Sequence, residues 1–309
     1  MPDWLDEPFS FETGVGSLAG SLRIAKSQAS PAPGALLLAG SGPIDRDGNA
    51  AGIPIGIQLA IADELAGQGI ASLRFDRRGI SDGGDWREAS FADNLADASA
   101  ALAALAADPR VDAARIVVIG HSEGALHAIQ LAARQDSGPK PAATVLLAGA
   151  ARQGAEILKW QAEAITRSQP AADQDVAVDE AIAQSVAAQA KIRATDSPVS
   201  EIDGVAINAG WMREFFDYNP ADDLQRVAGP LLAVTGGKDQ QVPPADLEQI
   251  AELVPGPCQT LAPENITHML RTNPAAATLA DYSRQLQEPV DAELLSELVG
   301  WVAGVLEEG

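Results

Sequence analysis

Short, mainly apolar segments alternate along this chain with segments whose apolar residues recur at helical spacing. The apolar segments are "ALLLAG" (35–40), "IASLRFD" (70–76), "RIVVIG" (115–120), "ATVLLAG" (143–149) and "PLLAVTGG" (230–237). Helical patterns lie between most of them, for example Ile57, Ile61 and Leu65 at a spacing of four residues. Strands that are apolar throughout and alternate with helices form parallel sheets covered by helices on both faces. The sequence therefore predicts an α/β fold with a mostly parallel central sheet flanked by helices.

Two regions of the chain depart from this alternation of apolar and helical segments. At the beginning, "FSFETG" and "LAGSLRIA" alternate polar and apolar residues, which predicts two antiparallel strands at one edge of the sheet. Residues 150–224 contain helical stretches and no convincing strand. Because catalytic groups in such sheets lie beyond the carboxyl ends of the strands, a helical insertion there can cover them. We expect residues 1–149 and 225–309 to form one core and residues 150–224 to form a helical cap.

The composition excludes several classes of function. The formal net charge is −22, with 43 acidic and 21 basic residues, and such a field repels nucleic acid and anionic lipid. Only five of the basic residues are lysines, while arginine and alanine dominate, and this composition fits either a GC-rich genome or adaptation to salt. The single cysteine, Cys258, allows neither an intrachain disulfide nor a cysteine metal cluster. No signal-peptide pattern opens the chain and no apolar run is long enough to span a membrane, so we expect a soluble, cytoplasmic protein.

The sharpest motif is "GHSEG" at residues 120–124, between the apolar run "RIVVI" and the helical stretch "ALHAIQLAA". Strand, Gly-x-Ser-x-Gly and helix in this order form a nucleophile elbow, a turn so tight that it needs glycine on both sides of the serine. The turn exposes the Ser122 hydroxyl at a helix N-terminus, where negative charge is favoured. The alternative is that Ser122 only caps the helix. The context of the motif favours a catalytic nucleophile.

A serine nucleophile needs a base, and the chain offers three histidines. His121 precedes the serine, so its side chain is expected to point away from the hydroxyl and to pack beside the elbow. His127 lies within the following helix and is not expected at the elbow. The elbow requires the chain order serine, acid, histidine, and only His268 in "ENITHMLR" lies downstream. His268 is therefore the expected base.

The acid of such a triad must follow a strand between the serine and the histidine. Asp239 in "PLLAVTGGKDQQVP" comes just after an apolar strand, whereas Glu264, four residues before His268, is the reserve candidate. Asp239 would accept the N–H of the histidine ring and fix its tautomer. The alternative role for Asp239 is that of an ordinary turn residue.

The remaining requirement is a pair of hydrogen-bond donors for the oxyanion. The Glu123 backbone N–H, directly after the nucleophile, is one. The loop "LLLAGSGPIDRDGN" should supply the other from the Ser41 N–H, with Gly40 as the alternative. This loop lacks the GxxxxGK[ST] pattern, so it is not an ATP-binding loop. No metal and no organic cofactor is implied.

With these residues identified, the sequence resembles the α/β-hydrolase superfamily, and within it bacterial serine esterases with a "GSGPxDRDGN"-type oxyanion loop. Residues 41–49 carry this loop. The segment "LRFDRRGISDG" (73–83) is similar to the family pattern D-x-R-G-x-G-x-S, with Ser81 where glycine is common. "YNPADDLQRVAGPLLAVTGGKDQQVP" and "NITHML" are similar to the segments around the acid and the histidine. The resemblance covers nearly the whole chain except the cap.

The resemblance implies hydrolysis of small to medium-chain carboxylic esters by Ser122, His268 and Asp239. "WMREFFDY" places Trp211, Phe215 and Tyr218 on one helical stripe, which is expected either to line the substrate pocket or to pack cap against core. The alternatives are a thioesterase, acyltransferase or amidase with the same triad, or a non-catalytic binding protein. A carboxylate-dependent haloalkane dehalogenase is disfavoured by the serine at position 122. The expected partner is a small-molecule ester, and the oligomeric state is undetermined.

Overall fold

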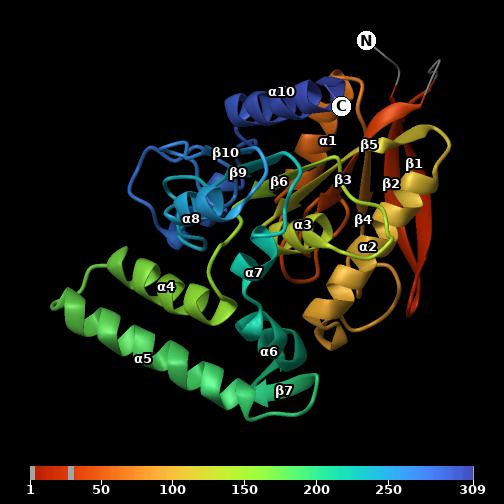
Figure 1. Ribbon diagram of the computed structural model, residues 1–309. Helices are drawn as coiled ribbons and strands as arrows, with labels where there is room; N and C mark the ends of the chain where they lie inside the picture. The colour runs from red at the N-terminus through yellow and green to blue at the C-terminus, as the bar shows by residue number, and fades with distance from the viewer. Residues whose placement is uncertain (1–3, 27–30, 309) are drawn as a thin grey trace.

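A computed structural model describes residues 4–26 and 31–308 of the chain, and its centre is an eight-stranded sheet (Figure 1). The strand order is β1-β2-β4-β3-β5-β6-β9-β10. Strands β1 and β2 are antiparallel, β2 is antiparallel to β4, and the remaining neighbours are parallel. The strands are β1 (Trp4–Thr13), β2 (Gly16–Ala25), β3 (Ala32–Leu38), β4 (Ala71–Phe75), β5 (Val111–His121), β6 (Ala143–Leu147), β9 (Leu231–Val234) and β10 (Cys258–Leu261). The predicted mostly parallel sheet with an antiparallel edge is confirmed.

Helices cover both faces of the sheet. One apolar core joins the sheet to α2 (Phe91–Ala107), α3 (Glu123–Ala133) and α8 (Asp246–Leu253). A second core joins the other face to α1 (Ile57–Gly67) and the C-terminal helix α10 (Ala292–Glu308). Figure 1 shows α1 and α10 together on one side of the sheet. Strands β3, β6 and β9 and residues 116–120 of β5 are almost entirely buried, which explains why these segments are mainly apolar.

The chain between β6 and β9 forms a separate group of elements at the carboxyl edge of the sheet (Figure 1). The helices of this inserted segment are α4 (Gly154–Arg167), α5 (Gln174–Arg193), α6 (Ala209–Asp217) and α7 (Pro220–Leu224). A short antiparallel hairpin, β7 (Val199–Ile202) and β8 (Val205–Asn208), lies between α5 and α6. The remaining short elements follow β10 or precede α2: η1 (Trp86–Glu88), η2 (Leu279–Asp281) and α9 (Tyr282–Gln285).

The hairpin corrects the expectation that residues 150–224 contain no strand. Its two strands have four residues each, which is too short to produce a clear alternation in the sequence. The turn between them is Asp203-Gly204, with φ of 51° and 81°. An Asp-Gly pair with two positive φ angles is the preferred two-residue hairpin turn, because its twist matches that of the strands. "EIDGVA" was therefore the local signal for this hairpin.

Candidate functional site

Ser122 lies at the turn between β5 and α3, where the backbone is strained. Its φ and ψ are 56° and −118°, an unfavourable region for a residue with a Cβ. A Cβ at Gly120 would overlap the Gly124 carbonyl oxygen, and one at Gly124 would overlap the Leu38 carbonyl oxygen. The Ser122 N–H donates to the Leu147 carbonyl oxygen on the neighbouring strand at 2.8 Å. Both glycines of the motif are therefore required by close backbone contacts, as the elbow geometry predicts.

Asp239 and His268 meet at the carboxyl end of the sheet. Asp239 follows β9, His268 follows β10, and both side chains are almost fully buried. His268 Nδ1 lies 2.8 Å from Asp239 Oδ2. The other carboxylate oxygen accepts the backbone N–H groups of Gln241 at 2.7 Å and Val242 at 2.9 Å. The carboxylate is thus fixed by two amides and fixes the histidine ring in turn.

Ser122 and His268 line one cavity of about 100 Å³, whose wall also includes Ser41. The ring nitrogen of His268 that faces away from Asp239 is Nε2, so it is the atom available to a hydroxyl in this cavity. Glu264, the reserve candidate for the acid, has an exposed side chain. The structure therefore brings together Ser122, Asp239 and His268 from three separate loops.

His121 packs beside the elbow as expected, and it also contacts the base. Its Nε2 lies 2.9 Å from the His268 carbonyl oxygen and therefore donates a hydrogen to it, and the two rings are 4.9 Å apart. Burial, together with the neighbouring His268, lowers the pKa of His121 to about 3. His121 is thus a neutral donor that holds the loop carrying the base.

The lowered pKa of His121 predicts a loss of stability in acid. The unfolded chain takes up this proton near pH 6.5, whereas the folded protein leaves His121 neutral down to about pH 3. The contribution of His121 to the free energy of unfolding is therefore fully present above pH 6.5. Below pH 6.5 it decreases by about 1.4 kcal/mol per pH unit. In urea unfolding, the stability difference between wild type and His121→Gln should narrow by about 2 kcal/mol between pH 6.5 and 4.5. A difference that stays constant with pH would contradict this.

His127 lies within α3, and its ring contacts the side chain of Glu123, the residue that follows the nucleophile. Its ring is buried and its Nε2 lies 3.0 Å from Glu123 Oε1, while Nδ1 contacts Gln130 Oε1 at 3.0 Å. Residues 123 and 127 are one helical turn apart, so their side chains share a face of α3. The spacing of four residues was the sequence signal for this contact.

The two expected oxyanion donors, the Ser41 and Glu123 N–H groups, lie beside the nucleophile. Ser41, Ser122 and Glu123 line a second cavity of about 160 Å³. Neither N–H has a hydrogen-bond acceptor in the part of the chain that the structure describes. An amide that is held in place and lacks a partner can receive a substrate oxygen without first breaking another bond.

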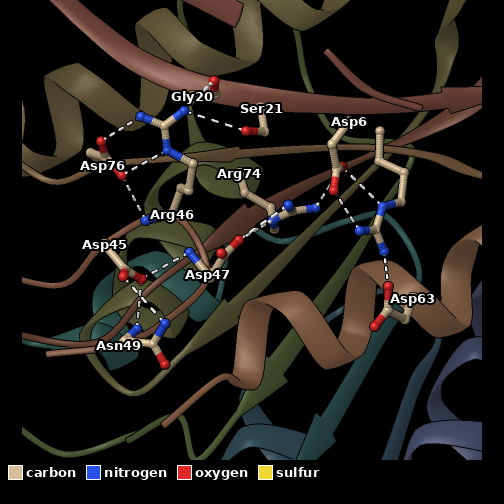
Figure 2. Close-up of polar contacts among 11 residues, drawn as sticks. Asp6, Gly20, Ser21, Asp45, Arg46, Asp47, Asn49, Asp63, Arg74 and Asp76 are labelled. Atoms are coloured by element: carbon tan, nitrogen blue, oxygen red, sulfur yellow. Dashed lines mark hydrogen bonds and ion pairs between the residues drawn. The ribbon is translucent and has the colours of Figure 1, made fainter. Parts of the chain in front are cut away.

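The loop after β3 is rigidly built by its own side chains (Figure 2). Asp45 Oδ1 accepts the backbone N–H groups of Asp47 at 3.0 Å and Asn49 at 2.8 Å. The Asn49 side-chain amide donates to Asp45 Oδ2 at 3.2 Å. Gly48 between them has a φ of 90°, which favours glycine. The "DRDGN" part of the motif thus closes a tight turn.

Arg46 fastens this loop to the sheet (Figure 2). Its guanidinium donates to both carboxylate oxygens of Asp76 at 2.9 and 2.6 Å and to the Gly20 carbonyl oxygen at 2.7 Å. Burial alone would raise the pKa of Asp76, but the hydrogen bonds from Arg46 outweigh it and hold this pKa below its usual range. Asp47 accepts from Arg74 on β4 at 3.1 Å. These pairs join residues far apart in sequence, so sequence reasoning missed Arg46, Arg74 and Asp76.

All three expected pocket residues line the 160 Å³ cavity together with Ser122. Trp211 and Phe215 stack with ring centroids 4.9 Å apart and an interplanar angle of 11°. The Tyr218 hydroxyl donates to Asp223 at 3.0 Å. These aromatic side chains also pack against the main core through Phe91. The stripe thus lines this cavity and also packs the insertion against the core.

A third cavity of about 480 Å³ adjoins the site on the side of the β7–β8 hairpin. Ser41 and Trp211 line both this cavity and the one that contains Ser122. Trp211 therefore borders both spaces. Among residues 4–26 and 31–308, no cluster of three or more His, Cys, Asp or Glu side chains could hold a metal ion. The helices in these same ranges include none that is long and apolar enough to cross a membrane.

Comparison with known proteins identifies the family to which this chain belongs. Residues 55–274 match the family described as serine aminopeptidase, S33. The chain is 26% identical over 308 residues to esterase EstD of Thermotoga maritima, and the match covers 98% of this chain and 70% of EstD.

Solved structures share the fold over almost the whole chain. DcsB in complex with its substrate analogue superposes with a TM-score of 0.64 at 15% identity, covering 98% of this chain and 99% of DcsB. Est1E from Butyrivibrio proteoclasticus with bound ferulic acid gives a TM-score of 0.63 at 16% identity, covering 97% of this chain and 98% of Est1E. The strand order, the strained elbow and the family match agree, and the chain is an α/β-hydrolase that belongs to the serine aminopeptidase, S33, family.

Proposed function

We propose that the protein is a serine carboxylesterase that hydrolyses small to medium-chain esters. The observation that carries this proposal is the bond between Asp239 and His268 beside the cavity of Ser122. The similarity to an esterase over nearly the whole chain supports the same chemistry. Buried carboxylate, histidine and a serine on a strained turn form the arrangement that activates a hydroxyl for acyl transfer.

In the proposed reaction, Ser122 Oγ attacks the ester carbonyl carbon while His268 Nε2 takes the hydroxyl proton. The carbonyl oxygen becomes an oxyanion, which accepts hydrogen bonds from the Ser41 and Glu123 N–H groups. The carbon–oxygen bond to the alcohol then breaks, and His268 gives its proton to the departing alkoxide. Water attacks the acyl-enzyme by the same steps, which releases the acid and restores Ser122. Asp239 stabilises the charged imidazole ring throughout.

The lining of the site favours an ester over a peptide with a free amino terminus. An aminopeptidase needs an unpaired carboxylate to bind the substrate ammonium group. Among the described residues that line the 160 Å³ cavity, the only carboxylate is Glu123, and Arg77 pairs with it at 2.8 Å. The cation in this lining, Arg152, is paired with Asp246. The cavity thus offers mainly apolar walls and no free charge, which suits an uncharged ester.

We further propose that residues 150–224 act as the cap over a core of residues 1–149 and 225–309. Ile157 and Leu158 of α4, Trp211 and Phe215 of α6 and the following Tyr218 line the same cavity as Ser122. The Gln161 side chain donates to the Gln241 carbonyl oxygen at 2.8 Å, which joins α4 to the loop that carries Asp239. The insertion therefore supplies most of the walls that a substrate would meet.

A panel of substrates that share one acyl group tests the reaction class. p-Nitrophenyl butyrate, butyryl thioester and butyryl p-nitroanilide should be cleaved in falling order of kcat/KM, with the anilide at least 100-fold slower than the p-nitrophenyl ester. Because the family is described as serine aminopeptidase, an aminoacyl p-nitroanilide is compared with the ester as well. Faster cleavage of the aminoacyl anilide than of the ester would favour an aminopeptidase, and a preference for the thioester would favour a thioesterase.

Replacing Trp211 by alanine should change chain-length preference more than the turnover of a small ester. Trp211 borders both the 160 Å³ cavity and the 480 Å³ cavity, so we expect removal of the indole to connect them. Across p-nitrophenyl acetate to decanoate, the optimum should move to longer chains, while kcat for the acetate stays within about threefold, because the variant leaves the reacting groups in place. Tyr218→Phe, which keeps the ring, is the matched control. An unchanged preference across the series would contradict the assignment of Trp211 to the pocket.

A further inference from the structure

Arg77 contacts both of the loops that supply the proposed oxyanion donors. Its guanidinium makes a bidentate pair with Glu123, with Nη1 to Oε2 at 3.0 Å and Nη2 to Oε1 at 2.8 Å. The same Nη1 also donates to the Gly40 carbonyl oxygen. The Arg77 backbone N–H donates to the Ile44 carbonyl oxygen at 3.1 Å. One side chain thus joins the loop after β3 to the first turn of α3.

The contact with Gly40 fixes the direction of the neighbouring Ser41 N–H. The Gly40 carbonyl and the Ser41 N–H belong to one planar trans peptide unit, so they point in opposite directions. Arg77 holds the carbonyl from one side of this unit. The N–H is thereby directed to the other side, and Ser41 lines the cavities that contain Ser122. Rotation of this peptide would turn the donor away from the oxyanion.

The contact of Arg77 with the Glu123 carboxylate fixes the second donor, because that donor is the backbone N–H of Glu123 itself. The Glu123 side chain is only 2% exposed. Its carboxylate accepts from Arg77, from Asn94 Nδ2 at 2.9 Å and from His127 Nε2 at 3.0 Å. Burial would raise the pKa of Glu123, but the charge of Arg77 and the hydrogen bonds hold it far below its usual range. Glu123 therefore stays ionised and immobile at the start of α3.

A neighbouring ion pair offers a comparison that separates positioning from general stability. Arg78, the next residue, pairs with Asp97 at 2.6 and 2.8 Å, and the Asp97 side chain is 4% exposed. This pair joins the same segment to α2 and holds no carbonyl of the loop after β3 in the part of the chain described. In both pairs the carboxylate is almost fully buried and accepts two hydrogen bonds from its arginine. Among the described contacts, Arg77 differs in that it also holds the Gly40 carbonyl, and Glu123 differs in that its own backbone supplies a proposed oxyanion donor.

We propose that Arg77 and Glu123 are positioning residues whose ion pair holds the two oxyanion donors in place, so that it acts on the tetrahedral intermediate and not on substrate binding. This inference rests on the proposed esterase activity; it adds Arg77 to the machinery and gives the Glu123 side chain a role beside that of its N–H. Precise placement of such donors is where acyl-transfer catalysis is most sensitive.

The test compares Arg77→Met, Glu123→Gln and the control Asp97→Asn with wild type. Kinetics on p-nitrophenyl acetate give kcat and KM, and a trifluoromethyl ketone that forms a hemiketal oxyanion on serine gives Ki. Arg77→Met and Glu123→Gln should lower kcat about 100-fold, the effect of losing one oxyanion donor. KM should change less than threefold, and Ki should rise in proportion to the loss of kcat. Asp97→Asn should lower the Tm by a similar amount while kcat and Ki stay within about threefold.

Several results would overturn the proposal. Equal losses of kcat in Glu123→Gln and Asp97→Asn would show that the Arg77–Glu123 pair has only a structural role. A raised KM with unchanged kcat would place the pair in substrate binding, and a lowered kcat with unchanged Ki would remove it from the oxyanion site.

If Arg77→Met does not fold, Arg77→Lys is the replacement variant. Lysine keeps the charge beside Glu123 but cannot also hold the Gly40 carbonyl in a forked geometry, so the same changes in kcat and Ki are expected. If wild type cleaves no ester at all, the proposed function fails, whereas normal wild-type turnover with unaffected variants refutes only this inference.

Discussion

Replacing Ser122 by alanine should lower kcat for any ester substrate by about a million-fold, with only uncatalysed or weakly assisted hydrolysis remaining. The loss is expected to be this large because no acyl-enzyme can form without the hydroxyl. The variant keeps a Cβ at the strained position, with its φ of 56°, so the turn itself is unchanged. Steady-state kinetics on p-nitrophenyl butyrate measure the effect, and thermal unfolding should show a Tm within a few degrees of wild type.

A matched serine variant makes this result specific. Ser41→Ala changes a hydroxyl in the same cavities but keeps the backbone N–H that is assigned to the oxyanion. It should retain kcat within about tenfold of wild type, because its proposed role belongs to the main chain. If Ser41→Ala were as inactive as Ser122→Ala, or if Ser122→Ala kept even a hundredth of the activity, Ser122 would not be the nucleophile.

Replacing Asp239 by asparagine should lower kcat about ten-thousand-fold near neutral pH. Asp239 accepts the Nδ1–H of His268 at 2.8 Å while its other oxygen accepts two backbone amides. An asparagine oxygen held by those amides would turn its NH2 group toward His268. The ring would then need its proton on Nε2, which is the wrong tautomer for a base at Ser122. Kinetics over a range of pH measure the effect.

Glu264→Gln is the control for the acid, because Glu264 is the other carboxylate near His268 in sequence. Its side chain is exposed, and His268 Nδ1 is bonded to Asp239. The Glu264 variant should keep wild-type kcat and KM. A large loss in Glu264→Gln together with a small loss in Asp239→Asn would reverse the assignment of the acid.

Local sequence patterns predict the sheet, the elbow and the three residues of the proposed triad. The mainly apolar segments predicted the buried strands of the sheet, and the glycines around Ser122 predicted the elbow. Asp239 followed from its place after an apolar strand. His268 followed by elimination, because the chain has only three histidines and the motif demands a downstream base.

The parts that the sequence did not reveal depend on long-range contacts. Arg77 meets residues 37 and 46 positions away, and nothing in "FDRRG" distinguishes it from Arg78. Arg77 faces Glu123 of α3 and Arg78 faces Asp97 of α2, so the partner of each arginine depends on where these two helices lie in the fold. His121 contacts the loop of His268 across 147 residues for the same reason. The β7–β8 hairpin was missed for a different reason, because strands of four residues are too short to show a clear alternation of polar and apolar residues.

The central claim is that Ser122 is a nucleophile activated by His268 and Asp239, and labelling with a fluorophosphonate tests it most directly. After reaction with an excess of probe, peptide mass spectrometry of the wild-type protein should find one adduct, on Ser122. The rate of labelling should fall at least 100-fold in His268→Ala and in Asp239→Asn, while the Tm of each variant shows that it remains folded. An unlabelled wild type, an adduct on another residue, or equal labelling rates in wild type and His268→Ala would contradict the claim.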